Sequence, residues 1–236
     1  MRRRRTLTGG IIAAGEGRRL RADGWLVPKP LVPVDGVPLL ETVIRNFLAA
    51  DIEPVTLIVS EGGRDCVEWS RTRFRDADLR FIVKTTASSL ESFAEVAAAN
   101  TPGPMLISTV DAWCHSVDFV RFVTAATARP STAIVLAVTP LVADENPLWV
   151  TLGAGGRVRR LGDRAGDVVT AGLYLIPEAL RRESPPRGLG RLRDFLAWLV
   201  ERGDAVYAET IETVVDVDRA CDVALAESLA QASRSA

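Results

Sequence analysis

The sequence predicts a three-layer α/β/α fold built on a mostly parallel, mixed sheet. Short apolar runs alternate with amphipathic helical stretches, which is the pattern of βαβ units. The first apolar run, residues 10–14, leads into a glycine-rich loop. The 236 residues are 47% hydrophobic and 25% charged, enough for one domain with a sizeable core. We therefore expect a Rossmann-like fold that forms a single domain over residues 1–236.

In the first half of the chain, each expected element rests on apolar periodicity and on capping or turn residues. The helix over residues 39–50 carries its apolar side chains on one face, and the strand over 55–59 is rich in Val, Leu and Ile. Ser88 and Glu91 form a capping box, so a helix begins there. The remaining elements expected in this half are strand 10–14, helix 63–74, strand 80–83, the end of the capped helix near residue 100, and strand 105–108.

In the second half, a helix is expected over residues 117–128 and a β-branched strand over 132–138. The sequence pattern changes between about residues 140 and 187, where short strand-like segments are separated by glycine turns. This segment predicts a small, partly antiparallel lobe that acts as a lid over the acceptor. Its strands are expected over 149–152, 157–161 and 168–176, followed by helix 189–201, strand 205–209 and a closing helix over 219–235.

Composition argues against several classes of partner. The formal net charge of −1 does not favour a nucleic-acid binder, so no nucleic-acid partner is expected. The basic run over residues 2–5 is interpreted as a solvated arm, with a tether to nucleic acid or to an anionic membrane as the alternative. No apolar run approaches the roughly 20 residues needed to span a bilayer, and the three cysteines lack metal-site or disulfide spacing. We expect a cytoplasmic protein without a membrane partner.

The strongest local pattern is the glycine-rich loop and the basic residues after it. Gly15 and Gly17 follow a buried strand and let backbone N–H groups approach a polyphosphate without obstruction by a Cβ atom. Arg19 and Lys29 add positive charge for phosphate oxygens. No Gly-Lys-Ser/Thr follows the glycines, so the loop is not a Walker A motif.

The two segments, GIIAAGEGRRL from residue 10 and PKPLVPV from residue 28, resemble the signature of nucleotidyltransferases. That family includes sugar-1-phosphate nucleotidyltransferases, molybdenum-cofactor guanylyltransferases and phosphocholine or phosphonate cytidylyltransferases. The resemblance implies catalytic roles for Arg19 and Lys29. It also implies that the nucleotide contacts the loop residues Ala13, Ala14, Gly15, Glu16, Gly17 and Arg18. Arg18 stands where the family usually has a small Thr or Ser.

Two aspartates are placed for a metal ion. Asp111 directly follows a buried strand, so it should lie at the carboxyl edge of the sheet, where open α/β sheets bind ligands. Asp216 precedes the last helix and can reach the same edge. Carboxylates that retain waters suit Mg²⁺, which neutralises the α-phosphate.

The resemblance supports the same pair. The family carries one Asp after a central strand and a second in a segment similar to VVDVDRACDVALAE, which starts at Val214. We assign a Mg²⁺ cofactor to Asp111 and Asp216, although Val110 replaces the usual glycine. Asp218 is expected to cap the closing helix.

Residues on the acceptor and base side are predicted mainly from the resemblance. Thr86, Ser88 and Ser89 precede a helix N-terminus, where the family recognises the base; plain helix capping is the alternative. Arg164 stands where related enzymes carry a lysine that contacts the sugar phosphate, and Gly172 lies in a strand where glycine lets the substrate approach. Trp25 and Trp113 flank the expected mouth and are candidates to stack on the base or sugar.

The resemblance implies transfer of a nucleoside monophosphate from an NTP to a small phosphorylated acceptor, with release of pyrophosphate. A sugar 1-phosphate is the preferred acceptor, and phosphocholine, a phosphonate or molybdopterin is the alternative. A nucleotide-diphosphosugar glycosyltransferase and a catalytically silent nucleotide-binding regulator are two further alternatives. The nucleobase stays open, and a homo-oligomer is possible. His115 is the sole histidine, so the sequence does not favour a mechanism that uses histidine for acid–base or hydrolytic chemistry.

Overall fold

The computed structural model describes residues 7–162 and 165–234. Within these residues the strands are β1 (Thr8–Ala13), β2 (Pro33–Val34), β3 (Val37–Pro38), β4 (Val55–Val59), β5 (Leu79–Val83), β6 (Met105–Thr109), β7 (Ala112–Trp113), β8 (Ile134–Thr139), β9 (Trp149–Leu152), β10 (Val158–Gly162), β11 (Val168–Ile176), β12 (Val206–Thr210) and β13 (Val215–Asp216). The helices are α1 (Arg18–Ala22), α2 (Leu39–Ala49), α3 (Arg64–Arg73), α4 (Ser89–Ala99), α5 (Ser116–Ala128), α6 (Glu178–Arg181), α7 (Leu192–Glu201) and α8 (Ala220–Arg234), with 3₁₀ turns η1 (Lys29–Leu31), η2 (Glu61–Gly63) and η3 (Ala154–Gly156). This order confirms the alternation of strands and helices expected from the apolar periodicity.

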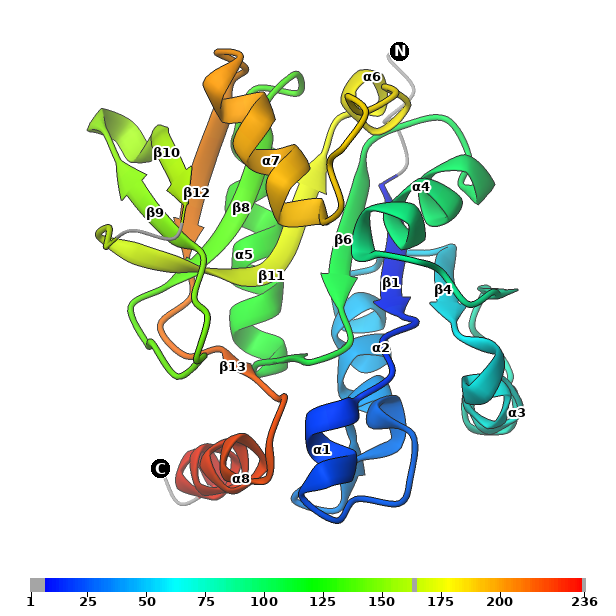
Figure 1. The fold of residues 1–236 in the computed structure, drawn as a ribbon. Coiled ribbons are helices and arrows are strands. Elements are labelled where there is room, and N and C mark those ends of the chain that lie inside the picture. The colour runs from blue at the N-terminus through cyan, green and yellow to red at the C-terminus, as the bar shows by residue number, and fades with distance from the viewer. Residues whose placement is uncertain (1–6, 163–164, 235–236) are drawn as a thin grey trace.

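A mixed sheet forms the middle layer and, in the described residues, contains nine strands (Figure 1). Its order is β10-β9-β11-β6-β1-β4-β5, and β8 pairs with β11 and β12. β1 runs parallel to both β4 and β6, with Ile11 opposite Leu57 and Ser108. β1, β4 and β8 are buried along their whole length, which explains why apolar residues and glycine predominate in them.

The partly antiparallel lobe is built by β9, β10 and β11, and these strands are continuous with the central sheet. β11 pairs antiparallel with β6, β8 and β9, so one long strand links the two parts. The β11–β8 register shifts between Thr170 and Tyr174, and Gly172 lies in this irregular stretch with φ of +70°. A Cβ atom at Gly172 would lie 2.6 Å from Thr109 Oγ1, so glycine is required here.

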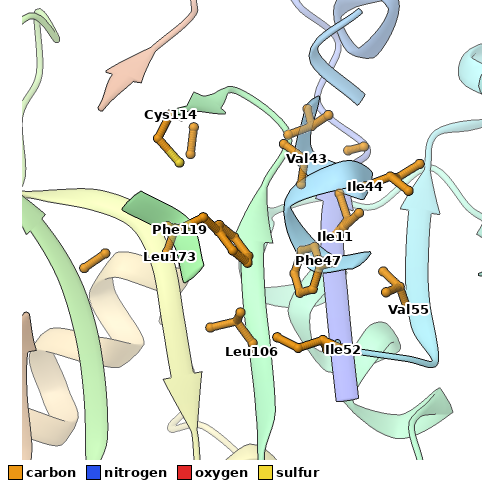
Figure 2. Close-up of a cluster of buried hydrophobic side chains, with 14 of the residues drawn as sticks. Ile11, Val43, Ile44, Phe47, Ile52, Val55, Leu106, Cys114, Phe119 and Leu173 are labelled. Atoms are coloured by element: carbon orange, nitrogen blue, oxygen red, sulfur yellow. The ribbon is translucent and has the colours of Figure 1, made fainter. Parts of the chain in front are cut away.

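Helices cover both faces of the sheet. One apolar cluster gathers side chains of α2, α3 and α5 against the sheet, and a second gathers those of α4 and α7 on the other face. In the first cluster, Phe47 of α2 meets Phe119 of α5 edge to face at 5.2 Å between ring centroids (Figure 2). Both rings are fully buried, and each stabilises the fold by roughly 1.5–3 kcal/mol relative to an exposed position. These two faces produce the expected three-layer α/β/α arrangement.

A third cluster lies beyond the carboxyl ends of β1 and β6, where α1 and α8 lie near each other in Figure 1. Its buried members include Leu20 and Val32 near the glycine loop and Val223 of α8. The Asp23 carboxylate accepts a hydrogen bond from the Ala220 backbone N–H at 3.0 Å. The start of α8 is therefore fixed beside the segment that carries the glycine loop.

No helix in the described ranges is long and apolar enough to cross a bilayer. The expected basic arm over residues 2–5 and Arg164 lie outside the described residues.

Candidate active site

A two-stranded ribbon brings two distant aspartates together. β7 and β13 pair antiparallel, with Asp216 opposite Ala112, the residue after Asp111. The Val217 backbone N–H donates to the Asp111 carbonyl at 3.0 Å, which continues the pairing. Val110 donates to the Ile12 carbonyl at 3.1 Å and is not among the residues with positive φ. Valine is therefore compatible with the backbone that leads into Asp111.

Three carboxylates form one cluster at this edge of the sheet. One oxygen each of Asp111, Asp216 and Asp218 lies within 4.8 Å of the others. The Asp216 Oδ1 atom is buried and has no hydrogen-bond partner among the described residues. An orphaned buried carboxylate oxygen is costly unless something binds it, and carboxylate oxygens are ligands that Mg²⁺ accepts. The cluster therefore fits a divalent metal.

Lys29 lies against the acid cluster. Its ammonium donates to Asp111 Oδ2 at 2.6 Å and to Asp218 Oδ1, and its side chain is only 7% exposed. Lys29 opens the turn η1 between two prolines, which restrict the backbone on both sides. Gly17 packs against it: a Cβ atom there would lie 2.8 Å from Lys29 Cβ, and Gly17 has φ of +61°. The glycine loop and Lys29 are therefore in direct contact.

Burial and neighbouring charges shift the pKa values of these groups. Burial alone would lower the pKa of Lys29, but Asp111 and Asp218 together raise it above its ordinary value. Burial would raise the pKa of Asp111, but the Lys29 charge holds it below its usual range. Burial, followed by the Asp111 charge, raises the pKa of Asp216 well above its usual value. A bound cation would stabilise the ionised carboxylate of Asp216 and so lower its pKa.

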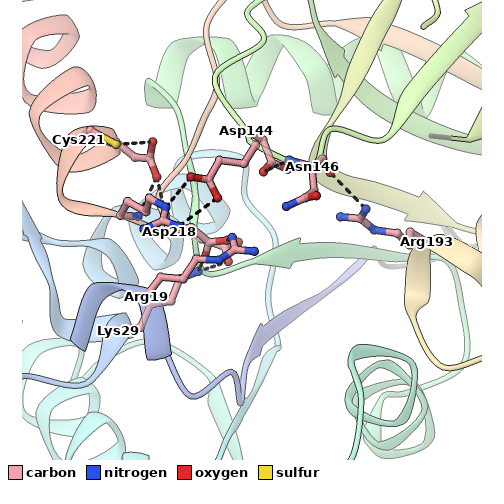
Figure 3. A network of polar contacts seen from close by, with 11 residues as sticks. Arg19, Lys29, Asp144, Asn146, Arg193, Asp218 and Cys221 are labelled. Atoms are coloured by element: carbon pink, nitrogen blue, oxygen red, sulfur yellow. Dashed lines mark hydrogen bonds and ion pairs between the residues drawn. The ribbon is translucent and has the colours of Figure 1, made fainter. Parts of the chain in front are cut away.

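Arg19 is the second cation of the site. Its Nη1 donates to Asp218 Oδ2 at 2.7 Å, so Asp218 bridges Lys29 and Arg19 (Figure 3). Arg18 pairs with Glu16, and both side chains are exposed. Gly15 is exposed, and a Cβ atom built there would meet nothing within 4 Å, so a ligand can approach its backbone.

A cleft of about 550 Å³ opens on these groups. It is lined by several of the predicted site residues, namely Arg19, Ser89, Asp111, Gly172 and Asp216, and by Asp218. Ala13 and Ala14 are buried at the end of β1, before the loop. The Ser88 hydroxyl accepts from the Glu91 N–H at 3.2 Å as the cap of α4, and the Thr86 hydroxyl contacts Ser92 at 2.6 Å.

Two expectations are wrong. Asp218 does not cap α8 with its side chain, because its carboxylate binds Lys29 and Arg19 instead; the Asp222 carboxylate accepts from the Asp218 and Arg219 N–H groups. Trp113 is 5% exposed and packs in the cluster beneath the site, with Trp25 against it, so stacking on a ligand is excluded for Trp113 in this structure.

Several residues of the cleft had no sequence signal. The loop between β8 and β9 covers it with Asp144 and Asn146, and the start of α7 adds Arg191 and Arg193. Glu145 of the same loop forms an ion pair with Arg219, with 2.7 Å between Oε1 and Nε. For Asp218 a signal exists, because Asp216 and Asp218 are two apart in an extended segment and so share a face.

Two characterised proteins are similar to this chain in sequence. Over 236 aligned positions, covering 93% of this chain and 51% of the relative, the chain is 28% identical to a bifunctional IPC transferase and DIPP synthase of Rubrobacter xylanophilus. It is 41% identical over 49 residues, 21% of this chain and 20% of the relative, to a 2-aminoethylphosphonate cytidylyltransferase of Lancefieldella rimae. The chain thus spans about half or less of the length of these relatives.

Solved structures share the fold at low identity. The inositol-1-phosphate CTP transferase of T. maritima superposes with a TM-score of 0.79 and 19% identity, covering 94% of this chain and 95% of that one. A Bacillus anthracis protein assigned as a glucose-1-phosphate thymidylyltransferase gives 0.83 and 16%, covering 96% of both chains. The model of the MobA-like NTP transferase domain matches residues 9–172. With the glycine loop and its lysine inside that match, the chain belongs to the MobA-like NTP transferase family.

Proposed function

We propose that this protein transfers CMP from CTP to the phosphate of a small phosphorylated polyol or sugar, releases pyrophosphate and depends on Mg²⁺. The observation that carries the proposal is the convergence of Lys29 and three carboxylates beside the glycine loop. Attack on an α-phosphate requires positive charge that neutralises the phosphate oxygens. A lysine beside an acid cluster that can hold a metal ion supplies such charge.

The choice of CTP and of a polyol or sugar phosphate is supported by the relatives. The T. maritima protein is named for CTP and inositol 1-phosphate, and the L. rimae relative is named as a cytidylyltransferase. The B. anthracis protein is named for a sugar 1-phosphate, so that acceptor class stays within the proposal.

The residues of this chain supply binding, orientation and charge. The backbone of Gly15 and Gly17 would hold the triphosphate, and Arg19 and Lys29 would face its oxygens once the ligand displaces their contacts with Asp218. In the unliganded protein, the Asp111 and Asp218 charges raise the pKa of Lys29 and keep its ammonium protonated. Asp111 and Asp216, with Asp218 nearby, would hold Mg²⁺, which when bound neutralises charge on the α-phosphate.

The chemical step needs no covalent enzyme intermediate. An oxygen of the acceptor phosphate forms a bond to the α-phosphorus, while the bond from that phosphorus to the bridging oxygen breaks. The electron pair of the broken bond leaves with pyrophosphate. Positioning of the two phosphates in the cleft and stabilisation of their charge account for the catalysis.

A substrate matrix tests the proposal. The four common NTPs are each incubated with inositol 1-phosphate, glucose 1-phosphate, phosphocholine and 2-aminoethylphosphonate in the presence of Mg²⁺, and pyrophosphate release is measured. We expect release only when CTP and a polyol or sugar phosphate are both present, and loss of release in EDTA. Release with another NTP in place of CTP would refute the assignment of cytosine as the base. Release with CTP and phosphocholine, but with neither the polyol phosphate nor the sugar phosphate, would refute the assignment of the acceptor class.

A further inference from the structure

The cleft has a second charged end, opposite the acid cluster. Arg191 and Arg193 flank the first residue of α7 and line the cleft. Figure 3 shows Arg193 beside Asn146, well separated from Arg19, Lys29 and Asp218. The Arg193 guanidinium therefore lies in the part of the cleft away from the proposed site of phosphoryl attack, and Arg191 also lines the cleft.

These two arginines form no side-chain ion pair among the described residues, although the Arg191 backbone N–H donates to Asp194 Oδ2 at 3.0 Å. Arg19 is paired with Asp218. In contrast, no ion pair involves Arg191 or Arg193 within residues 7–162 and 165–234. One nitrogen of Arg193 donates to the Asn146 carbonyl at 3.3 Å, which leaves most of its five donors free. Unpaired guanidinium groups in a cleft are suited to a planar anionic group that accepts two hydrogen bonds.

Two further titratable groups line the cleft. Tyr174 is one of them, and burial raises the pKa of its hydroxyl to about 12. Asp144, the remaining acid among the described lining residues, accepts a hydrogen bond from the Asn146 N–H at 2.9 Å, and its charge helps to raise the pKa of Asp216. No ion pair joins Asp144 to Arg191 or Arg193 in the described residues.

We propose that the acceptor carries a second anionic oxygen group, a carboxylate or a further phosphate, which Arg191 and Arg193 bind while the reacting phosphate lies at the acid cluster. The inference rests on the proposed function, because it assigns the acceptor to this cleft. It also predicts that acceptors with a cationic group at that end, such as phosphocholine, are disfavoured by repulsion.

Three compounds that share one ring isolate the second group: glucose 1-phosphate, glucuronic acid 1-phosphate and glucose 1,6-bisphosphate. Their affinities are measured by calorimetry on the full chain with Mg²⁺ and a non-hydrolysable CTP analogue. We expect at least one of the two doubly anionic compounds to bind about tenfold or more tightly than glucose 1-phosphate, with a preference that weakens as salt is raised. The two arms distinguish a carboxylate from a second phosphate.

The double variant Arg191→Gln/Arg193→Gln should reduce this preference to less than threefold. The matched control is Arg64→Gln/Arg75→Gln, which removes two exposed arginines outside the cleft lining and should retain the preference. Equal affinities for the three compounds, absence of measurable binding, or a preference that persists in the cleft variant would each overturn the inference. Because binding is measured without turnover, a lack of pyrophosphate release would count against the proposed function only.

Discussion

Lys29 joins parts of the chain that are far apart in sequence. Its ammonium contacts Asp111, which follows β6, and Asp218, which precedes α8, and its Cβ packs on Gly17. A single side chain therefore ties the glycine loop to the acid cluster. Its substitution should affect both catalysis and the stability of the cluster, and the two effects can be separated.

Lys29→Ala should lower kcat by about 100-fold or more, because the proposed function places this cation at the reacting phosphates. It should also destabilise the metal-free protein by roughly 1–3 kcal/mol, since the carboxylates lose their buried partner. Steady-state pyrophosphate release and thermal unfolding in EDTA measure the two effects. Lys84→Ala, which removes a half-exposed lysine paired with Glu91 and Glu95, is the control and should change neither by much. Near-normal turnover in Lys29→Ala would remove Lys29 from the mechanism.

Gly17→Ala should lower activity at least tenfold. Alanine at φ of +61° is strained by roughly 1–2 kcal/mol, and its Cβ would displace Lys29. Gly155→Ala provides the comparison, because Gly155 has φ of +67° but no atom within 4 Å of an added Cβ. Both variants should lose similar stability in a melting experiment, and only Gly17→Ala should lose activity. Equal activities would show that the contact with Lys29 is unimportant.

The three cysteines should differ in reactivity at pH 8. Burial raises the pKa of Cys66 to about 11 and that of Cys114 to about 12, so both are protonated as well as inaccessible. Cys221 is exposed. A disulfide reagent such as DTNB should therefore modify one thiol rapidly, and Cys221→Ser should abolish this phase. Two rapid equivalents in the native protein would contradict the burial of the other cysteines.

At the scale of elements, the cap of α4 offers a direct test of how Ser88 acts. Its hydroxyl accepts from the Glu91 N–H, so Ser88→Ala should cost about 1 kcal/mol and lower the Tm by about 2–4 °C. Ser88→Asn retains a capping side chain and should restore most of the Tm. Failure of asparagine to restore it would indicate a role for Ser88 other than capping.

The elements themselves were predictable because they depend on local patterns. The apolar face of α2 and the capping box of α4 each depend on residues that lie close together in the sequence. Both helices begin within a residue of the expected position. The candidate site was predictable where it follows strand ends, as for Asp111. The role of Asp218 and the arginines of α7 were not, because the β7–β13 pairing and the packing of α7 beside the cleft are tertiary. Trp113 was misplaced for the same reason.

At the scale of the whole molecule, ligands should stabilise the fold by binding the native state alone. Mg²⁺ with CTP at about 100 times the dissociation constant should add about 2.7 kcal/mol, which corresponds to a rise in Tm of about 5–11 °C. Asp216→Asn should abolish most of this rise, whereas Asp76→Asn, at an exposed acid outside the cleft, should not. The measurement is thermal unfolding with and without EDTA. An undiminished rise in Asp216→Asn would place the metal elsewhere.

The β7–β13 ribbon also affects the order in which the site assembles during synthesis of the chain. Residues 9–172, the part that matches the family, contain the glycine loop, Lys29 and one of the three clustered carboxylates, while Asp216 and Asp218 arrive later along the chain. The contact between Lys29 and Asp218 spans 189 positions, so it closes at a high entropic cost and after local structure has formed. A growing polypeptide can therefore acquire most of its architecture on the ribosome while still lacking the centre that would engage metal and nucleotide.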